Sequence, residues 1–379
     1  MKGARSSLTR GPCSNRVARP KDIHGGDIWQ ASRLRGASPE ELLDFSASIN
    51  PLGFPSSARK ALLSAVKSIP PYPDPSSSVL KEAIAGFHAI GTDEVVPANG
   101  SNEIINIIPR LLKRGPALIV EPAFSEYRKA LELSGIRVRS HLLREQDGFR
   151  LDAARLRKAI EGCSAVYIAN PSNPAGVLTL REELLDIISF AKNKGALAVV
   201  DEAFADFTGV SVIPEAVRAG NVIVLKSMTK FYAMAGLRLG YAVGARRLMA
   251  RLSAFIPAWS VNTLASSAGV AALKDRAFRK KTLEWFETEK EFLFSGLASL
   301  GLTPFESSAN YIMVKLNGGV DARELRSSLL EKNGILIREL SAFPGLGPEF
   351  FRVAVLGREA NKKLVAALRG FLKSGPPLF

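Results

Sequence analysis

The sequence predicts an α/β protein with a mostly parallel sheet covered by helices on both faces, followed by a smaller α+β domain. Between about residues 100 and 275, short apolar runs alternate with helical patterns, which is the order expected of parallel strands and their crossover helices. After residue 275, a long charged helical pattern precedes short strands and a final helix. With 379 residues, of which 46% are hydrophobic, the chain is long enough for two domains.

The N-terminal part is interpreted from its helix caps and its prolines. Residues 38–41 (SPEE) have the pattern of a capping box, which predicts a short helix that continues through Leu42 and Leu43. Residues 56–68 have a helical pattern. Residues 69–78 contain four prolines and are therefore not expected to form the interior of a helix or strand.

Five apolar runs are expected to form strands of the main sheet. A helix between the second and third run is marked by Thr179 with Glu182 as a capping box and by Gly195 as its end. The five runs are Ala117–Val120, Ala165–Ala169, Ala196–Val200, Asn221–Leu225 and Leu239–Val243.

The C-terminal part is expected to contain two helices and three strands. The helices are predicted at Asp275–Leu300 and near Ala360–Leu372, and the strands at Asn310–Lys315, Ile335–Ile337 and Phe351–Val355. Together these patterns divide the chain into four parts. They are a basic tail over residues 1–22 that is expected to be disordered, a segment over residues 23–58 that joins the small domain, a large domain over residues 59–275, and a small domain over residues 276–379.

The composition narrows the function classes. Two cysteines exclude a disulfide framework and a four-cysteine zinc site, and they favour a reducing cytoplasm. Three histidines without metal-binding spacing give no reason to expect a metal, and no apolar run is long enough for a membrane span. The net charge of +15 comes without a nucleic-acid-binding signature, so we expect an anionic small substrate rather than nucleic acid. Six of the basic residues lie in the tail, which lacks the apolar core of a secretory signal.

The most informative motif is residues 227–240 (SMTKFYAMAGLRLG), which follow an expected strand. Lys230 is therefore expected at the carboxyl edge of the parallel sheet, where open α/β folds bind ligands. Ser227 and Arg238 are close enough in sequence to reach one phosphate beside it. A lone lysine at such a place is more often a solvated charge, so the interpretation depends on the other motifs.

Three further motifs lie at strand ends or at a helix start. Asp201 ends an apolar strand, and it is either a turn residue or a carboxylate that pairs with a protonated pyridine nitrogen. Asn173 lies in a turn made rigid by two prolines, residues 170–176 (NPSNPAG). Gly100 and Ser101 begin a helix whose free N–H groups suit an anion, although most such helix starts bind only water.

The four motifs in this order resemble those of the fold-type I pyridoxal-phosphate enzymes, in the aminotransferase class I and II superfamily, over about residues 23–375. The resemblance implies a seven-stranded, mostly parallel sheet in the large domain. Within the superfamily the chain is similar to the histidinol-phosphate aminotransferases and, more closely, to the threonine-phosphate decarboxylases of cobalamin synthesis. The decarboxylase pattern fits residues 24–28 (HGGDI), 44–53 (DFSASINPLG), 201–204 (DEAF) and 257–262 (PAWSVN). At the position of Phe204 the aminotransferases usually have tyrosine.

The resemblance assigns catalytic roles to Lys230 and Asp201. Lys230 would carry the cofactor, pyridoxal 5'-phosphate, and move the proton at the substrate's α-carbon, while Asp201 would keep the ring nitrogen protonated. Arg352 would bind the substrate's carboxylate, and Arg338 with His24 its phosphate. The other implied cofactor-binding residues are Gly100, Ser101, Asn102, Phe124, Asn173, Ser227, Arg238 and Tyr72, and the other implied substrate-binding residues are Asn50 and Asn173.

The implied reaction is decarboxylation of L-threonine O-3-phosphate to (R)-1-aminopropan-2-yl phosphate. The alternative is an aminotransferase for histidinol phosphate or an aromatic amino acid. A non-catalytic pyridoxal-phosphate-binding regulator is more remote, because residues 1–22 are too few for a DNA-binding module. The resemblance also implies a homodimer in which Tyr72 reaches the neighbouring subunit's site.

Two residues depart from the decarboxylase pattern, and two peptide bonds are expected to be cis. Ser48 stands where asparagine is common, and Ala175 stands where threonine is common. The expected cis bonds are Asn173–Pro174 and Glu121–Pro122, which the resemblance implies for the turns that aim Asn173 and Phe124 at the cofactor ring.

Overall fold

The computed structural model describes residues 25–374, so His24 and the basic tail over residues 1–22 lie outside the described residues. Among the residues that are described, no helix is long and apolar enough to cross a membrane.

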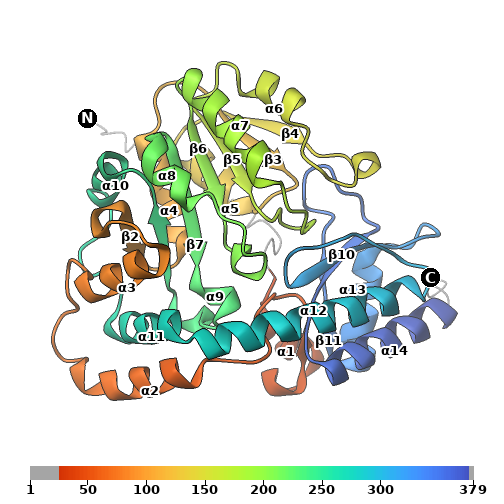
Figure 1. The fold of residues 1–379 in the computed structure, drawn as a ribbon. Coiled ribbons are helices and arrows are strands. Elements are labelled where there is room, and N and C mark those ends of the chain that lie inside the picture. The colour runs from red at the N-terminus through yellow and green to blue at the C-terminus, as the bar shows by residue number, and fades with distance from the viewer. Residues whose placement is uncertain (1–24, 375–379) are drawn as a thin grey trace, which may run out of the picture.

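A seven-stranded sheet forms the centre of the larger part of the molecule (Figure 1). Its strand order is β2-β8-β7-β6-β5-β3-β4, and β8 runs antiparallel to β2 and β7, while the pairs from β7 to β4 are parallel. The predicted mostly parallel sheet is thus confirmed. The strands are β2 (Val95–Ala98), β3 (Ala117–Glu121), β4 (Val138–Leu142), β5 (Ala165–Ala169), β6 (Leu197–Asp201), β7 (Val222–Ser227) and β8 (Gly240–Val243).

Helices cover both faces of this sheet because successive strand residues point to opposite sides. In β3, Leu118 and Val120 belong to one core cluster, and Ala117 and Ile119 belong to the other. The first face packs against α3 (Ser78–His88), α6 (Ala153–Ile160), α7 (Arg181–Asn193), α8 (Ile213–Ala219) and α11 (Thr263–Lys274). The second packs against α4 (Ser101–Ile107), α5 (Ser125–Leu133) and α10 (Arg246–Ser253).

The C-terminal part builds its own core around a four-stranded antiparallel sheet of order β12-β13-β10-β9. A separate pair joins β1 to β11 in parallel, so residues near the N-terminus pack with this part of the chain. The elements are β1 (Leu43–Asp44), β9 (Thr303–Pro304), β10 (Tyr311–Lys315), α13 (Ala322–Asn333), β11 (Ile335–Leu336), β12 (Arg338–Glu339), β13 (Phe350–Ala354) and α14 (Arg358–Ser374).

The long helix α12 (Arg276–Ala298) belongs to both cores. Phe286 packs in the core of the large sheet, whereas Leu293 and Leu297 pack in the core of the C-terminal part. In Figure 1 this helix runs from α11 toward α13 and α14. The remaining helices are α1 (Ile28–Arg35), α2 (Ser56–Ala65), which packs against α11, and α9 (Met228–Phe231).

Two local expectations were wrong. The helix expected to continue through Leu42 and Leu43 is a single 3₁₀ turn (Pro39–Glu41), after which Leu43 donates its backbone N–H to the carbonyl of Gly334 as part of β1. The cap of α7 lies one residue later than expected, at Leu180, whose N–H donates to Glu183. Thr179 is held instead by the side chain of Asn170, which bonds both its N–H and its carbonyl.

Candidate active site

The carboxyl ends of three neighbouring parallel strands border a cavity of about 550 Å³. Asp201 is the last residue of β6, Ser227 is the last residue of β7, and Asn173 lies in the loop after β5. Lys230 lies in α9, which begins directly after β7. The predicted site residues that line the cavity are Ser101, Asn102, Phe124, Asn173, Asp201, Ser227, Lys230, Arg238, Arg338 and Arg352.

Three other predicted residues are described but do not line this cavity. Gly100 directly precedes α4. Asn50 is buried, and its side-chain amide donates to the carbonyl of Phe231 at 2.8 Å and to the hydroxyl of Thr282 at 3.0 Å. Tyr72 is 78% exposed and stacks on Trp259 with ring centroids 4.6 Å apart. The Asn50 amide therefore ties the backbone beside Lys230 to α12 rather than facing the cavity.

Lys230 has an amine suited to proton transfer near neutral pH. Burial, together with the positive charges of Arg352 and Arg238, lowers its pKa to about 8. The backbone carbonyl of Lys230 accepts a hydrogen bond from the N–H of Asn50, which fixes the turn of α9.

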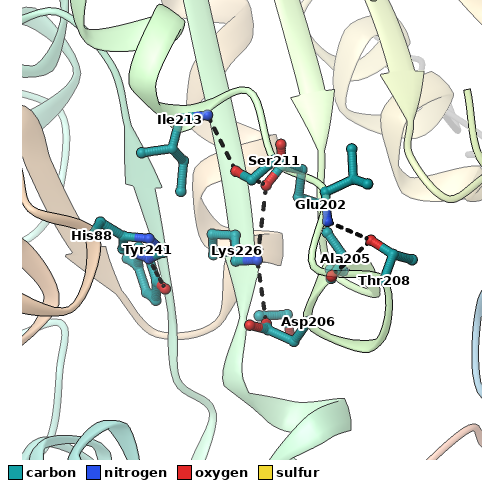
Figure 2. Close-up of polar contacts among 12 residues, drawn as sticks. His88, Glu202, Ala205, Asp206, Thr208, Ser211, Ile213, Lys226 and Tyr241 are labelled. Carbon is teal, nitrogen blue, oxygen red and sulfur yellow. Dashed lines mark hydrogen bonds and ion pairs between the residues drawn. The ribbon is translucent and has the colours of Figure 1, made fainter. Parts of the chain in front are cut away.

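Lys226, four residues earlier, is a structural charge. Its side chain is 4% exposed, and its ammonium lies 3.3 Å from a carboxylate oxygen of Asp206 and 3.8 Å from one of Glu202. Figure 2 shows the amine between these two carboxylates, and Lys226 does not line the cavity. The buried carboxylates therefore distinguish the two lysines of the motif.

Asp201 is a buried carboxylate with both oxygens bonded. Oδ1 accepts the N–H of Ala203 at 2.9 Å, and Oδ2 accepts the hydroxyl of Tyr127 at 2.5 Å. Burial raises the pKa of Asp201, and the Tyr127 hydroxyl, the Ala203 N–H and the charge of Lys226 oppose that rise.

A set of anion-binding donors lies beside Lys230. The start of α4 offers the backbone N–H of Ser101, and the hydroxyls of Ser227 and Thr229 lie 2.7 Å apart. Arg238 lines the same cavity and donates to the carbonyl of Ala235 at 3.2 Å. Backbone N–H, hydroxyl and guanidinium groups together are the donors that bind phosphate.

Two arginines reach the cavity from neighbouring strands. Arg338 of β12 and Arg352 of β13 are directly paired in register, and each is 8% exposed. Arg352 donates to Oδ1 of Asn173 at 2.6 Å and to the carbonyl of Ser46 at 3.1 Å. The cavity therefore holds two buried cations in addition to the phosphate-type donors.

Comparison with known proteins identifies the family. The sequence model of the aminotransferase class I and II family matches residues 40–368. The threonine-phosphate decarboxylase of Salmonella typhimurium is 38% identical over 93% of this chain and 98% of its own length. The chain belongs to the aminotransferase class I and II family.

Solved structures of this family also match. The histidinol-phosphate aminotransferase of Clostridium acetobutylicum superimposes with a TM-score of 0.83 at 30% identity, covering 88% of this chain and all of that one. The L-threonine-O-3-phosphate decarboxylase of Porphyromonas gingivalis gives a TM-score of 0.78 at 25% identity, covering 87% and 99%. The family's cofactor is pyridoxal phosphate, and it is the cofactor of this chain.

The residues of the cavity fit this cofactor. A Cβ at Gly240 would collide with the backbone nitrogen of Ser101, and a Cβ at Gly100 would lie 2.9 Å from the guanidinium of Arg238. Gly240 therefore lets the start of α4 approach β8 closely, and Gly100 lets the guanidinium of Arg238 approach the start of α4, as a phosphate cradle requires. The carboxylate of Asp201 would suit a protonated ring nitrogen, and the amine of Lys230 would suit the cofactor's aldehyde.

Other cavity residues were not found from the sequence. Tyr127 and Thr229 line it, as do Glu126, Lys129 and Phe343. Thr229 lies inside the quoted motif and could have been found there, whereas Tyr127 lies on a helix with no motif of its own. Ser48 and Ala175 are buried and do not line the cavity. Both expected cis bonds are confirmed, and Asn170–Pro171 is cis as well.

Proposed function

We propose that this family member decarboxylates L-threonine O-3-phosphate to (R)-1-aminopropan-2-yl phosphate for cobalamin biosynthesis. The observation that carries the proposal is the register pair of Arg338 and Arg352 in the cavity that also holds Lys230. A substrate with a carboxylate at one end and a phosphate at the other matches two separate buried guanidinium groups. The 38% identity to the Salmonella typhimurium decarboxylase supports the same reaction.

Each residue has a defined task in this proposal. Arg352 binds the carboxylate and Arg338 binds the phosphate. Because the two arginines lie on neighbouring strands, they set the distance between the two anionic groups that a substrate must have. Pyridoxal phosphate, when bound, supplies a conjugated ring that withdraws electrons from the bonds at the substrate's α-carbon. The carboxylate of Asp201 keeps the ring nitrogen protonated. The start of α4, Ser227 and Arg238 bind the cofactor's phosphate.

Lys230 supplies the proton that the α-carbon needs after the carboxylate has left. An amine with a pKa of about 8 changes its protonation state near neutral pH, so it can both give and take a proton there. Because the orientation of the substrate decides which α-carbon bond breaks, the two arginines select between loss of CO₂ and loss of a proton.

The second candidate is an aminotransferase for histidinol phosphate or an aromatic amino acid. The match to the Clostridium acetobutylicum histidinol-phosphate aminotransferase favours it. Phe204 favours decarboxylation instead, since the aminotransferases that the chain resembles usually have tyrosine there. Its ring packs edge-on against Tyr311 with centroids 4.9 Å apart, and it brings no hydroxyl to the cavity.

The deciding experiment is an assay without a keto-acid acceptor. Incubated with L-threonine O-3-phosphate alone, the holoenzyme should release CO₂ over many turnovers. An aminotransferase would stop after one equivalent of product per site and resume when 2-oxoglutarate is added. That result would replace the proposed reaction with the second candidate.

We also propose a homodimer in which Tyr72 contributes its hydroxyl to the phosphate cradle of the neighbouring subunit. The exposure of Tyr72 and its absence from the lining of its own subunit's cavity support this arrangement. The stacked Trp259 belongs to a loop that also bonds the start of α4, because Ser260 accepts the N–H of Asn99 at 3.2 Å. A cytoplasmic location remains the expectation from the cysteine content.

A further inference from the structure

Tyr127 is a buried tyrosine whose hydroxyl meets the carboxylate of Asp201. It lies in the first turn of α5, is 2% exposed, and donates to Oδ2 of Asp201 at 2.5 Å. Its ring is fixed on two sides, edge-on against Phe124 with centroids 5.8 Å apart and tilted against Tyr167 at 5.6 Å. Packing therefore holds the Tyr127 hydroxyl in place, so its hydrogen bond to Asp201 costs little further side-chain entropy.

The hydroxyl acts on the carboxylate that faces the cavity. A buried carboxylate is costly in its charged form, and each hydrogen bond that it accepts favours that form. Burial accordingly raises the pKa of Asp201, and the Tyr127 bond opposes this most strongly, followed by the N–H of Ala203 and the charge of Lys226. Tyr127 remains a neutral donor, because burial raises its own pKa well above the usual value.

We propose that Tyr127 is a positioning residue that keeps Asp201 ionised and aimed at the ring nitrogen of the cofactor. Without the hydroxyl, Oδ2 loses its partner and the carboxyl group binds a proton more readily. A protonated Asp201 can no longer stabilise a protonated ring nitrogen, so the specific affinity for a ring that contains that nitrogen falls. The inference rests on the role proposed for Asp201.

The chain offers a matched control. Tyr167 is as deeply buried as Tyr127 and packs against it, but its hydroxyl has no hydrogen-bond partner among residues 25–374. Tyr127→Phe and Tyr167→Phe each remove one buried oxygen from the same layer of the core. They differ in whether that oxygen bonds Asp201.

The test compares two ligands that differ at one ring atom. Dissociation constants of pyridoxal phosphate and of 1-deazapyridoxal phosphate, in which a carbon replaces the ring nitrogen, are measured for wild type and both variants. We expect Tyr127→Phe to reduce the preference for the nitrogen-containing ring by about tenfold, as for loss of a hydrogen bond to a charged group. Tyr167→Phe should leave the ratio unchanged. Site-specific 3-fluorotyrosine at position 127, an isosteric and stronger donor, should raise it.

Two outcomes would overturn the inference, and they are distinguishable from failure of the proposed function. An equal loss of affinity for both ligands in Tyr127→Phe, or equal ratios in the two Phe variants, would mean that Tyr127 only supports the fold. In Asp201→Asn the preference should disappear altogether. A preference that survives Asp201→Asn would refute the role of Asp201 itself, and with it the cofactor geometry on which the proposed function depends.

Discussion

Arg352 and Asn173 are joined by a 2.6 Å hydrogen bond, although 179 positions separate them in the chain. The arginine belongs to the antiparallel sheet of the C-terminal part, and the asparagine follows a strand of the large sheet. A second bond from Arg352 to the carbonyl of Ser46 holds the guanidinium in place, while its buried Nε has no partner among residues 25–374. The group proposed to bind the carboxylate and a group proposed to bind the cofactor therefore form one unit across the two sheets.

The two arginines should have separable effects on substrate binding. A lysine cannot reproduce the two-pronged geometry of a guanidinium, so Arg338→Lys should raise the KM for L-threonine O-3-phosphate by about tenfold for each charge-assisted bond lost. It should alter the KM for unphosphorylated threonine little. Arg352→Lys should weaken the binding of both substrates, because both have the carboxylate. Equal losses for the two substrates in Arg338→Lys would show that Arg338 does not read the phosphate.

Lys230 should react as an amine at unusually low pH. Since its pKa is lowered to about 8 from the ordinary 10.5, the neutral form accumulates as the pH rises through 8. In the cofactor-free protein, labelling of Lys230 by an amine reagent should therefore reach half its maximal rate near pH 8. Arg352→Met removes a neighbouring positive charge, so it should move this midpoint to higher pH.

The same labelling experiment tests the distinction between the two lysines. Lys226 is buried between two carboxylates, so its peptide should remain unlabelled under conditions that modify Lys230. Borohydride treatment of the holoenzyme should likewise attach the cofactor to Lys230. A label on Lys226 in either experiment would contradict the assignment of the reactive lysine.

Lys226→Met should destabilise the fold strongly. It would leave the carboxylates of Glu202 and Asp206 buried with one cation, Arg279, which lies 3.0 Å from Asp206. Removing one partner from a buried ionic cluster costs about 3–5 kcal/mol, whereas breaking an exposed pair costs about 0–1 kcal/mol. Urea unfolding should therefore show a large loss for Lys226→Met and a small one for Lys362→Met, whose pair with Glu359 is exposed. Similar losses of stability in the two variants would mean that water or a structural rearrangement compensates the buried carboxylates for the lost positive charge.

The sequence predicted the central strands well and missed the two strands at the edges of the sheet. The first four residues of β3 and of β5 to β8 are uncharged and mostly apolar because both faces of these strands are covered. β4 contains Arg139 and His141, since one edge of it faces solvent, and β2 contains Pro97, which an edge strand tolerates. Each of these segments forms a strand because it pairs with an adjacent strand of the sheet, and the local sequence pattern does not show that pairing.

The site shows the same division. Residues inside local motifs at strand ends, such as Asp201 and Lys230, could be placed from the sequence because parallel strands end at one edge of the sheet. Tyr127 could not be found this way, since its hydroxyl reaches Asp201 from a helix 74 positions away. Asn50 lies in a motif but is turned toward α12, where Thr282 accepts its amide hydrogen bond. Motifs thus locate backbone positions, while side-chain direction depends on packing between distant segments.

The proposed dimer can be tested by mixing two defective subunits, at a cofactor concentration too low to load Tyr72→Phe alone. Lys230→Ala removes the amine, and Tyr72→Phe removes only the hydroxyl while keeping the ring that stacks on Trp259. If Tyr72 serves the neighbouring site, each hybrid dimer has one site with both changes and one site with neither. Co-expression in equal amounts should then restore about a quarter of wild-type activity, because half of the dimers of a twofold-symmetric enzyme are hybrids with one intact site each.

The arrangement within one subunit makes the opposite prediction for the same mixture. If Tyr72 served its own subunit's cradle, every site in a hybrid would retain one of the two changes, and mixing would not raise activity above that of the separate variants. The cofactor affinity of Tyr72→Phe must therefore be measured alone first, because its loss is the defect that the hybrid would repair. Tyr72 is 78% exposed in a single subunit. Restoration by the hybrid requires that its hydroxyl become part of a neighbour's phosphate cradle, which links the exposed Tyr72 directly to the second cavity.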